Sequence, residues 1–198
     1  MLFRETALKG AYTIELEPFS DERGQFVRTW CRDEFRRHGI DAEFTQSAVS
    51  INTQRGTMRG MHWQAAPHEE AKLVRCARGA IYDVIIDLQP GSPTFRQWAG
   101  FTLTPRSQLM LYIPKGFAHG FQTLLDDSEV TYQLSAAHAP ESARGLRYDD
   151  PALGIDWPLP ISRISDRDRS WPLLQSNGGA GSGRTTRADG TASVSLPG

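Results

Sequence analysis

The sequence predicts a mainly β fold, built as a β-sandwich or barrel with few short helices. Most of its hydrophobic periodicity has a period of two or occurs in short apolar runs, which is typical of strands. Turn-forming residues separate these segments at even spacing, and many short, evenly spaced strands favour a sandwich or barrel. The sequence contains no βαβ repeat and no glycine-rich phosphate loop, which argues against a Rossmann or P-loop nucleotide site.

The individual elements follow from this periodicity and from the turn residues between them. Strands are expected at 11–17, 25–29, 45–52, 72–78, 80–88, 96–103, 108–113, 117–124 and 129–135. Turn chemistry separates them at 21–24, 79, 90–91, 105, 114–116 and 126–127. Helix is scarce: one short helix is expected over 33–38, capped by Asp33 and ended by Gly39, and a short turn follows Pro140.

Composition and charge indicate one globular domain. The chain has 198 residues, of which 39% are hydrophobic and 23% charged, enough for a real core. The formal net charge is −1, so no global field attracts nucleic acid or an anionic membrane. The N-terminus lacks an apolar signal core and no apolar run approaches the length of a membrane span, so we expect a cytoplasmic protein.

The single domain is expected to span 1–174, and its two cysteines are expected to be unpaired. Cys31 and Cys76 lie far apart and share no C-x-x-C spacing, which favours free, partly buried thiols. After Leu174 the composition changes to Gly, Ser, Thr and Arg, with too little apolar surface to offset the entropy of ordering. Residues 175–198 are therefore predicted to be a flexible tail.

Three side chains in the middle of the chain suggest chemistry beside a carbonyl. Arg59 and His62 lie ten residues or slightly more before Lys72, which opens the alternating segment Lys-Leu-Val-Arg-Cys-Ala-Arg. Neighbouring strands are expected to direct all three side chains into one pocket. An arginine, a histidine and a lysine in one pocket suit proton removal from an anionic keto compound.

Six motifs in one order resemble the dTDP-4-dehydrorhamnose 3,5-epimerase family. They are Asp-Glu-Arg-Gly at 21–24, Arg-Gly-Met-His at 59–62, Lys-Leu-Val-Arg at 72–75, Asp-Leu-Gln-Pro-Gly-Ser-Pro-Thr-Phe at 87–95, Ile-Pro-Lys-Gly-Phe-Ala-His-Gly-Phe at 113–121, and Asp-Asp-Pro-Ala-Leu-Gly-Ile-Asp-Trp-Pro at 149–158. The resemblance covers roughly residues 1–174. It implies a cupin-type jelly roll, usually dimeric, that acts without a cofactor on a nucleotide-linked 4-keto-6-deoxy sugar.

The chemistry requires three roles, which the resemblance distributes over four residues. Inversion beside a ketone needs a base on one face, a group that stabilises the enolate, and an acid on the other face. His62 suits the base, because an imidazole is mostly neutral at neutral pH yet accepts a proton. The resemblance implies Asp168 as its orienting partner, with Asp166 a near neighbour. It also implies Lys72 at the ketone and Tyr132 as the proton donor.

The substrate-binding positions include several departures from the family pattern. The expected binding residues are Arg23, Arg28, Gln46, Arg59, His119, His138 and Arg167. Arg59 suits a bidentate hold on the diphosphate. Arg23 matches a phosphate-binding arginine from the N-terminal region, which acts either within its own subunit or across a dimer interface.

Four changes concern the nucleotide side of the site. Arg28 replaces a glutamate, Ser47-Ala48 replaces Asp-Asn, His138 replaces a stacking tyrosine, and Ala143 replaces a glutamate. Arg28 either pairs with a phosphate oxygen or is a surface charge. The chemistry is therefore expected to be preserved, while the identity of the nucleotide stays open.

Several alternatives remain open from the sequence. Relatives invert carbon 3 only or carbon 5 only, and ketoisomerase relatives generally lack the tyrosine that Tyr132 supplies here. A non-catalytic sugar-nucleotide-binding cupin is a different class of function. A metal-dependent cupin would need His62, Glu69, Glu70 and His119 as a weak ligand set, which a nearby lysine ammonium disfavours.

Overall fold

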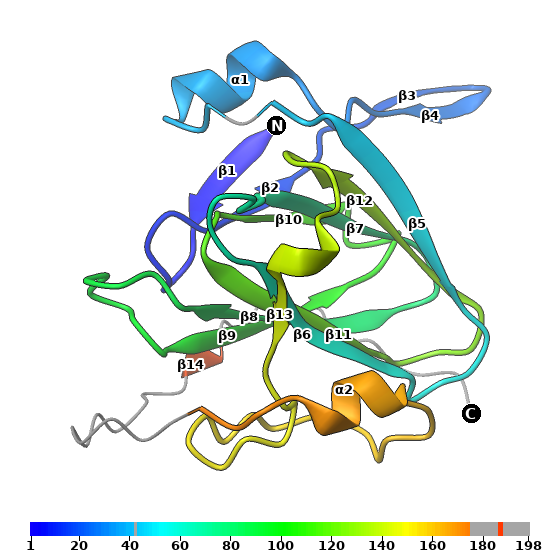
Figure 1. Ribbon diagram of the computed structural model, residues 1–198. Helices are drawn as coiled ribbons and strands as arrows, with labels where there is room; N and C mark the ends of the chain where they lie inside the picture. Colours follow the sequence, from blue (N-terminus) through cyan, green and yellow to red (C-terminus); the bar gives the residue numbers. More distant parts are fainter. Residues whose placement is uncertain (42, 175–185, 188–198) are drawn as a thin grey trace.

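Two six-stranded sheets pack face to face in the computed structural model (Figure 1), which describes residues 1–41, 43–174 and 186–187. The first sheet has the order β1 (Leu2–Glu5), β2 (Tyr12–Glu15), β10 (Leu109–Ile113), β7 (Lys72–Arg78), β12 (Ser128–Leu134), β5 (Gln46–Asn52). The second has the order β13 (Ala143–Gly145), β6 (Met58–Gln64), β11 (Phe117–Thr123), β8 (Ile81–Asp87), β9 (Trp98–Leu103), β14 (Thr186–Arg187). This arrangement confirms the predicted mainly β, jelly-roll sandwich.

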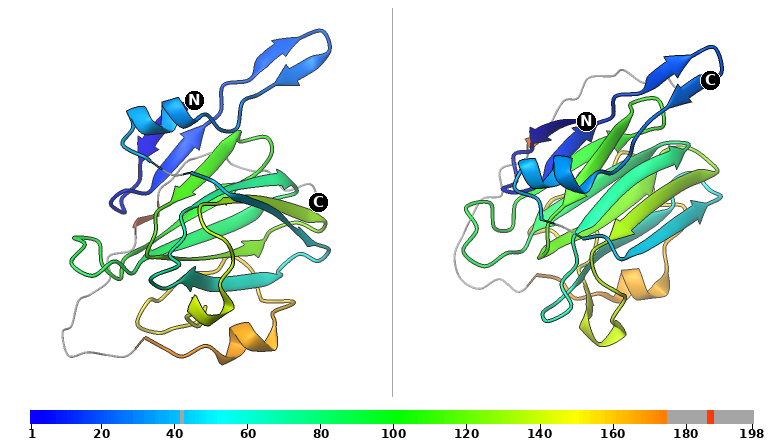
Figure 2. Two further views of the ribbon diagram at one scale, coloured as in Figure 1. Left: turned by 45° about the horizontal axis from the view of Figure 1, so that its top comes forward. Right: turned by 90° about the horizontal axis from the view of Figure 1, so that it is seen from above.

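A small hairpin and three short helical segments complete the fold. The hairpin, β3 (Phe19–Asp21) and β4 (Gly24–Phe26), projects away from the sandwich (Figure 2). The helices are α1 (Arg32–Arg37), the 3-10 helix η1 (Pro140–Ser142) and α2 (Asp166–Ser170). In the described part of the chain, no helix is long and apolar enough to cross a membrane. The cytoplasmic location stays a prediction.

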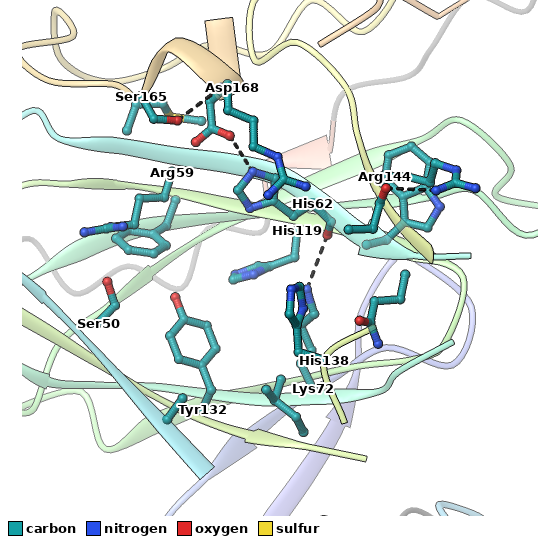
Figure 3. Close-up of a pocket in the computed structure, with 18 of the residues that line it drawn as sticks. Ser50, Arg59, His62, Lys72, His119, Tyr132, His138, Arg144, Ser165 and Asp168 are labelled. Carbon is teal, nitrogen blue, oxygen red and sulfur yellow. Dashed lines mark hydrogen bonds and ion pairs between the residues drawn. The ribbon is translucent and has the colours of Figure 1, made fainter. Parts of the chain in front are cut away.

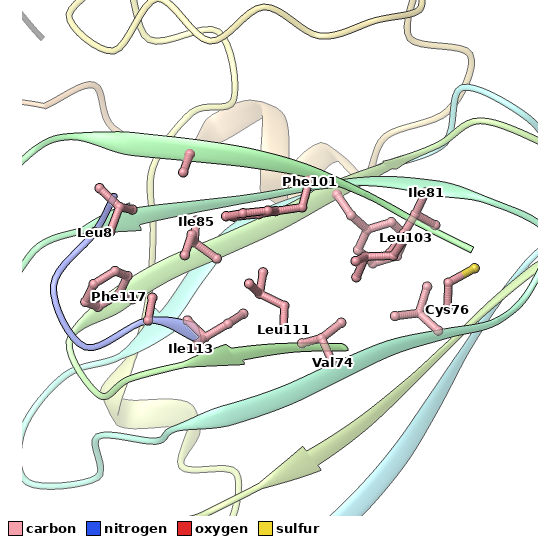
Figure 4. Packing of buried hydrophobic residues seen from close by; sticks show 14 residues of the cluster. Leu8, Val74, Cys76, Ile81, Ile85, Phe101, Leu103, Leu111, Ile113 and Phe117 are labelled. Carbon is pink, nitrogen blue, oxygen red and sulfur yellow. The ribbon is translucent and has the colours of Figure 1, made fainter. Parts of the chain in front are cut away.

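The main core lies between the sheets. Inward-facing side chains of both sheets form one buried cluster, which includes Val74, Ile85, Leu111 and Phe117 (Figure 4). Because successive strand residues point to opposite faces, these positions match the period of two in the sequence. The apolar cluster fills one part of the space between the sheets. Polar side chains line the remaining part, where the candidate site lies.

Two further clusters cover the outer faces of the sheets. One packs α1, through its buried Phe35, against the first sheet. The other packs the segment that follows β13 against the second sheet, with Met58, Trp98 and Leu153 buried in it. Figure 1 shows this segment and α2 lying beneath the second sheet. The second cluster therefore positions α2 close to β6.

Eight of the expected strands lie close to their predicted limits, and several elements were missed. The strand expected at 25–29 is the shorter β4. A strand carrying Arg59 and His62 was expected without limits and is β6, whereas β1, β3, β13 and α2 were not anticipated. The helix begins one residue earlier than predicted, with Cys31 rather than Asp33 as its N-cap and no side-chain cap. The turn after Pro140 is confirmed as η1.

The cysteine prediction is confirmed, whereas the tail lies mostly outside the described residues. Cys31 and Cys76 are both free thiols, and Cys76 is buried. Of the tail at 175–198, only Thr186–Arg187 is described, where the backbone pairs in parallel with β9. The extent of the single domain over 1–174 stays a prediction.

Candidate active site

A cavity of about 680 Å³ opens between the two sheets at the polar end of the sandwich. Strands β5, β7 and β12 of the first sheet and β6, β11 and β13 of the second contribute to it, and the segment around α2 closes one side. Its wall includes Ala48, Ser50, Arg59, His62, Glu70, Lys72, His119, Tyr132, His138, Arg144, Arg163, Ser165, Arg167 and Asp168. Figure 3 shows His62 and Asp168 across the cavity from Tyr132 and Lys72.

His62 and Asp168 form a hydrogen-bonded pair. The Nε2–H of His62 donates to Oδ1 of Asp168 at 2.5 Å. The His62 side chain is 43% exposed to the cavity, whereas that of Asp168 is only 6% exposed. In the described part of the chain no group hydrogen-bonds the Nδ1 of His62. The carboxylate thus fixes the tautomer and leaves Nδ1 as the nitrogen able to take a proton.

Local backbone geometry brings this pair together. Ser165 caps α2, since its Oγ accepts a hydrogen bond from the backbone N–H of Asp168 at 3.1 Å. The backbone N–H of Gly60 on β6 donates to the other carboxylate oxygen of Asp168 at 3.3 Å. Strand β6 and helix α2 therefore meet at the carboxylate, which is why residues more than a hundred positions apart form one unit.

The environment keeps Asp168 ionised. Burial by itself would raise the pKa of this carboxyl group. The hydrogen bond and positive charge of His62, the Gly60 N–H and the Trp171 indole N–H outweigh burial and hold the pKa below its usual value. An ionised Asp168 stabilises the imidazolium that forms when His62 accepts a proton.

Lys72 places an ammonium group in the same cavity from the first sheet. Its Nζ donates to the backbone carbonyl of His62 at 3.3 Å and lies 3.2 Å from Oε1 of Glu70. The side chains of Lys72 and Glu70 are only 9% and 10% exposed. Because these side chains are largely shielded from water, a fixed ammonium interacts more strongly with a nearby negative charge than it would in bulk solvent.

Tyr132 lies on β12, facing His119 of the opposite sheet. The two rings are in edge contact, with centroids 6.0 Å apart. Burial, with a smaller contribution from the charge of Asp83, raises the pKa of the Tyr132 phenol, and the positive charge of Arg59 opposes this only weakly. The phenol is therefore protonated at neutral pH and is available as a proton donor.

His119 is part of a second histidine–aspartate pair. Its Nε2 lies 2.9 Å from Oδ2 of Asp83 on β8. His119 and His62 are direct partners across β11 and β6. The side chains of His119 and Asp83 are 5% and 0% exposed, whereas His62 is far more open to the cavity. Of these two histidines, His62 is therefore the one that is accessible from the cavity.

The structure brings four of the seven expected binding residues to the cavity. Arg59, His119, His138 and Arg167 line it, and the Nε–H of Arg59 donates to Asn52 Oδ1 at 2.7 Å. In the described chain, three expected residues lie away from its wall. Arg23 is on the β3–β4 hairpin and pairs with Asp21, Arg28 pairs with Glu34 at 2.9 Å, and Gln46 is exposed on the edge strand β5.

Several polar residues of the site were not anticipated in these roles. They are Glu70 as the partner of Lys72, Asp83 as the partner of His119, Trp171 as a donor to Asp168, and Arg144 and Arg163 in the cavity wall. One of them had a signal in the sequence, because Asp83 interrupts the apolar run Ile-Tyr-Asp-Val-Ile-Ile. A buried carboxylate in such a strand requires a partner.

The weak metal-ligand set is not assembled. Glu70 pairs with Lys72, and Glu69 does not line the cavity. Among the described residues no group of three histidine, cysteine, aspartate or glutamate side chains has the arrangement of a metal site.

Comparison with known proteins gives the same assignment as the motifs. The dTDP-4-dehydrorhamnose 3,5-epimerase family pattern matches residues 5–176. An enzyme of that name from Sinorhizobium fredii is 39% identical over 88% of this chain and 90% of its own length.

Two solved structures share the fold at similar coverage. The dTDP-6-deoxy-D-glucose-3,5-epimerase of Legionella pneumophila, in complex with dTDP-4-keto-L-rhamnose, has a TM-score of 0.82 and 35% identity over 87% of this chain and 92% of its own. The 3'-monoepimerase ChmJ of Streptomyces bikiniensis, in complex with dTDP-quinovose, has a TM-score of 0.79 and 32% identity over 85% and 86%. From its motifs, its fold and these matches, the chain belongs to the dTDP-4-dehydrorhamnose 3,5-epimerase family.

Proposed function

We propose that this protein epimerises C3 and C5 of a dTDP-linked 4-keto-6-deoxy sugar through an enolate, with His62 as the base and Tyr132 as the acid. The observation that carries the proposal is the placement of these two groups. His62 is on the second sheet and Tyr132 on the first, so they face the cavity from opposite sides. A base and an acid on opposite sides of a sugar ring invert a carbon, whereas one group returning its own proton does not.

The first step is proton abstraction by His62. Nδ1 takes the proton from the carbon beside the ketone, and the electrons of the broken C–H bond move to the carbonyl oxygen. Asp168 stabilises the resulting imidazolium through its 2.5 Å hydrogen bond. The imidazolium afterwards releases its proton to water.

Lys72 stabilises the enolate. Its ammonium interacts more strongly with the full negative charge of the enolate oxygen than with the neutral ketone, and this difference lowers the barrier. The contacts with the His62 carbonyl and with Glu70 support this role, because they hold the ammonium in place before substrate arrives.

Tyr132 delivers the second proton. Its phenol protonates the enolate carbon on the face opposite His62, and the phenolate regains its proton from solvent. The raised pKa of Tyr132, caused by burial, supports this role because the group stays protonated until the enolate forms. The same site acting at both carbons requires the sugar to present C3 and C5 in turn.

The nucleotide end of the substrate lies along the cationic part of the cavity. We assign Arg59 to the diphosphate of the substrate, and we assign His138 and Arg167 to the region of its nucleobase. The substituted positions Ala48, His138 and Ala143 all line the cavity, where a bound nucleotide would contact them. The solved relatives that hold dTDP sugars support dTDP as the nucleotide. Arg28 pairs with Glu34, which favours its role as a surface charge.

We propose a homodimer in which the β3–β4 hairpin of one subunit reaches the cavity of the other. Phe19 and Phe26 on this hairpin are 80% and 77% exposed, and Val49 and Ile51 on the edge strand β5 are also exposed. Exposed aromatic residues on a projecting hairpin favour burial against a second protein surface. Arg23, whose side chain is 84% exposed, would then supply a phosphate contact to the partner's cavity.

Proton NMR in heavy water tests the reaction. With dTDP-4-keto-6-deoxyglucose, the protein is expected to exchange the protons at both C3 and C5 and to form the rhamno-configured ketone. Exchange at one carbon would make the enzyme a monoepimerase. A His62→Ala variant is expected to abolish exchange, with His38→Ala as the control for an exposed histidine outside the cavity. Binding of the nucleotide sugar without exchange would favour a binding protein and overturn the proposal.

A further inference from the structure

Trp171 contacts both His62, the proposed base, and Asp168, the carboxylate that orients it. It follows α2 directly, and its indole N–H donates to Oδ1 of Asp168 at 3.2 Å. The same oxygen accepts the hydrogen bond of His62. The indole also meets the His62 imidazole edge-on, with ring centroids 6.3 Å apart. The tryptophan therefore lies against the base as well as against the carboxylate that orients it.

The indole of Trp171 packs against Gly145, where only a glycine leaves room for the ring. Gly145 on β13 is the cross-strand partner of His62, and a Cβ at this position would lie 2.2 Å from the Trp171 ring. The guanidinium of Arg167 lies over the same ring, 5.0 Å from its centroid. This is cation–π geometry, which restrains an otherwise exposed arginine at the cavity wall.

The short helix α2 depends on tertiary contacts such as that of Trp171 to hold Asp168 in place. α2 has only five residues, and a helix of that length has little stability of its own. Asp168 is therefore held by tertiary hydrogen bonds rather than by a rigid helix. Gly60 fixes one carboxylate oxygen, and Trp171 and His62 share the other, so the carboxylate is held at both oxygens.

We propose that Trp171 is a positioning residue, which holds the Asp168–His62 pair and Arg167 in one arrangement. The inference rests on the proposed function, in which His62 is the base. The indole N–H fixes the carboxylate and partly neutralises its charge, while the ring fixes Arg167 at the nucleotide end. These two contributions are separable, because Trp171→Phe keeps an aromatic ring next to Gly145 and Arg167 but removes the indole N–H.

Removing the N–H changes the charge felt by His62 in a defined direction. The Asp168 carboxylate then carries more of its negative charge toward the imidazole, which stabilises the protonated form of His62. The acid limb of the kcat/KM profile therefore moves to higher pH. The other titratable or charged groups facing this pair are Arg59, Glu70, Lys72, Asp83, His119, Tyr132, His138, Arg144, Arg163 and Arg167, and the substitution alters none of them.

Two variants and a matched control test the inference. Trp171→Phe is expected to lower kcat about tenfold, the usual effect of losing a hydrogen bond to a charged group, with little change in KM. Trp171→Leu is expected to raise KM as well, because Arg167 loses its support. Trp157→Phe is the control: its indole donates to the backbone carbonyl of Tyr148 at 2.9 Å, outside the cavity wall, so its deletion is expected to leave the pH profile unchanged.

A merely structural role would give a different result. If Trp171→Phe lowered stability and activity together but left the acid limb where it is in the wild type, the inference would be wrong. A readout without turnover separates this from failure of the proposed function: NMR titration of the His62 ring signals, with Trp171→Phe expected to titrate at higher pH than wild type. An unchanged midpoint would overturn the inference even in an active enzyme.

Discussion

The role of Tyr132 is testable by separating proton exchange from inversion. In Tyr132→Phe, His62 still removes the proton and its imidazolium still exchanges with solvent, but no phenol donates on the opposite face. We expect deuterium incorporation with retained configuration to persist, while inversion falls by about 10² to 10⁴-fold. Proton NMR in heavy water measures both rates in one sample. An equal fall in exchange and inversion would mean that Tyr132 is not the acid.

Asp168 is expected to contribute both to turnover and to the stability of the fold. Asp168→Asn keeps the shape of the side chain but removes the charge that stabilises the imidazolium, so we expect kcat to fall by about 10³ to 10⁴-fold. Because the pKa of Asp168 is lowered in the folded state, its ionisation stabilises the fold above the unfolded value of about 3.9. This contribution is lost as the pH falls through the folded pKa.

Urea unfolding at several pH values checks this sign. The wild type is expected to be more stable than Asp168→Asn at neutral pH, and the difference is expected to narrow below about pH 4. A difference that is constant from neutral to acidic pH would show that the charge of Asp168 does not contribute to stability.

At the residue scale, the sequence predicted several side chains that line the cavity but not the residues that support them. His62, Lys72, Tyr132 and Asp168 stand in recognisable motifs, and all four line one cavity. Trp171 has no such motif. Its contacts depend on how α2 lies against β6 and β13, which no local pattern in the sequence encodes.

At the scale of elements, the neighbouring strands β6 and β11 shift register at Gly60 and approach so closely there that this position admits no side chain. Gly60 has φ of +119°, and a Cβ there would lie 2.5 Å from Gly120 Cα. Gly60→Ala is expected to destabilise the fold by about 3 kcal/mol or more, through unfavourable φ and overpacking together, and to displace His62. Gly24→Ala is the matched control, since Gly24 has φ of +122° with no atom within 4 Å of its Cβ position.

Urea unfolding of the two variants separates strain from crowding. Gly24→Ala reports the conformational strain alone, and the excess loss in Gly60→Ala reports the close approach of the strands. Equal losses in the two variants would mean that β6 moves freely away from β11.

Local sequence patterns explain which elements were predicted. Strand β7 matches its predicted limits because Leu73, Val74 and Cys76 give a clear strand pattern. Strand β6, which carries His62, was expected without limits because its sequence Met-Arg-Gly-Met-His-Trp-Gln has no β-branched residue and contains the glycine that the close approach to β11 requires. Helix α2 was missed because five residues are too few to show a helical period.

At the scale of the whole molecule, the cavity of one chain lacks one of its expected phosphate ligands. The sequence placed Arg23 in the binding set and left open whether it acts within its own subunit. In the structure it lies on the projecting hairpin, paired with Asp21, and not in the cavity wall of its own described chain. Strand pairing and motif spacing describe a single chain, so the subunit in which Arg23 acts depends on an assembly that they do not encode.

Subunit complementation decides the matter. Arg23→Ala and His62→Ala homodimers are each expected to be impaired, since every cavity lacks one of the two groups. In a heterodimer purified through two different tags, the cavity that keeps His62 receives Arg23 from the His62→Ala subunit. If Arg23 acts across the interface, one cavity in two is complete and the heterodimer is expected to recover about half of the wild-type rate, as two-fold symmetry requires. If Arg23 acts within its own subunit, neither cavity is complete and no activity above that of the homodimers appears. A monomeric wild-type protein in light scattering would contradict the dimer itself.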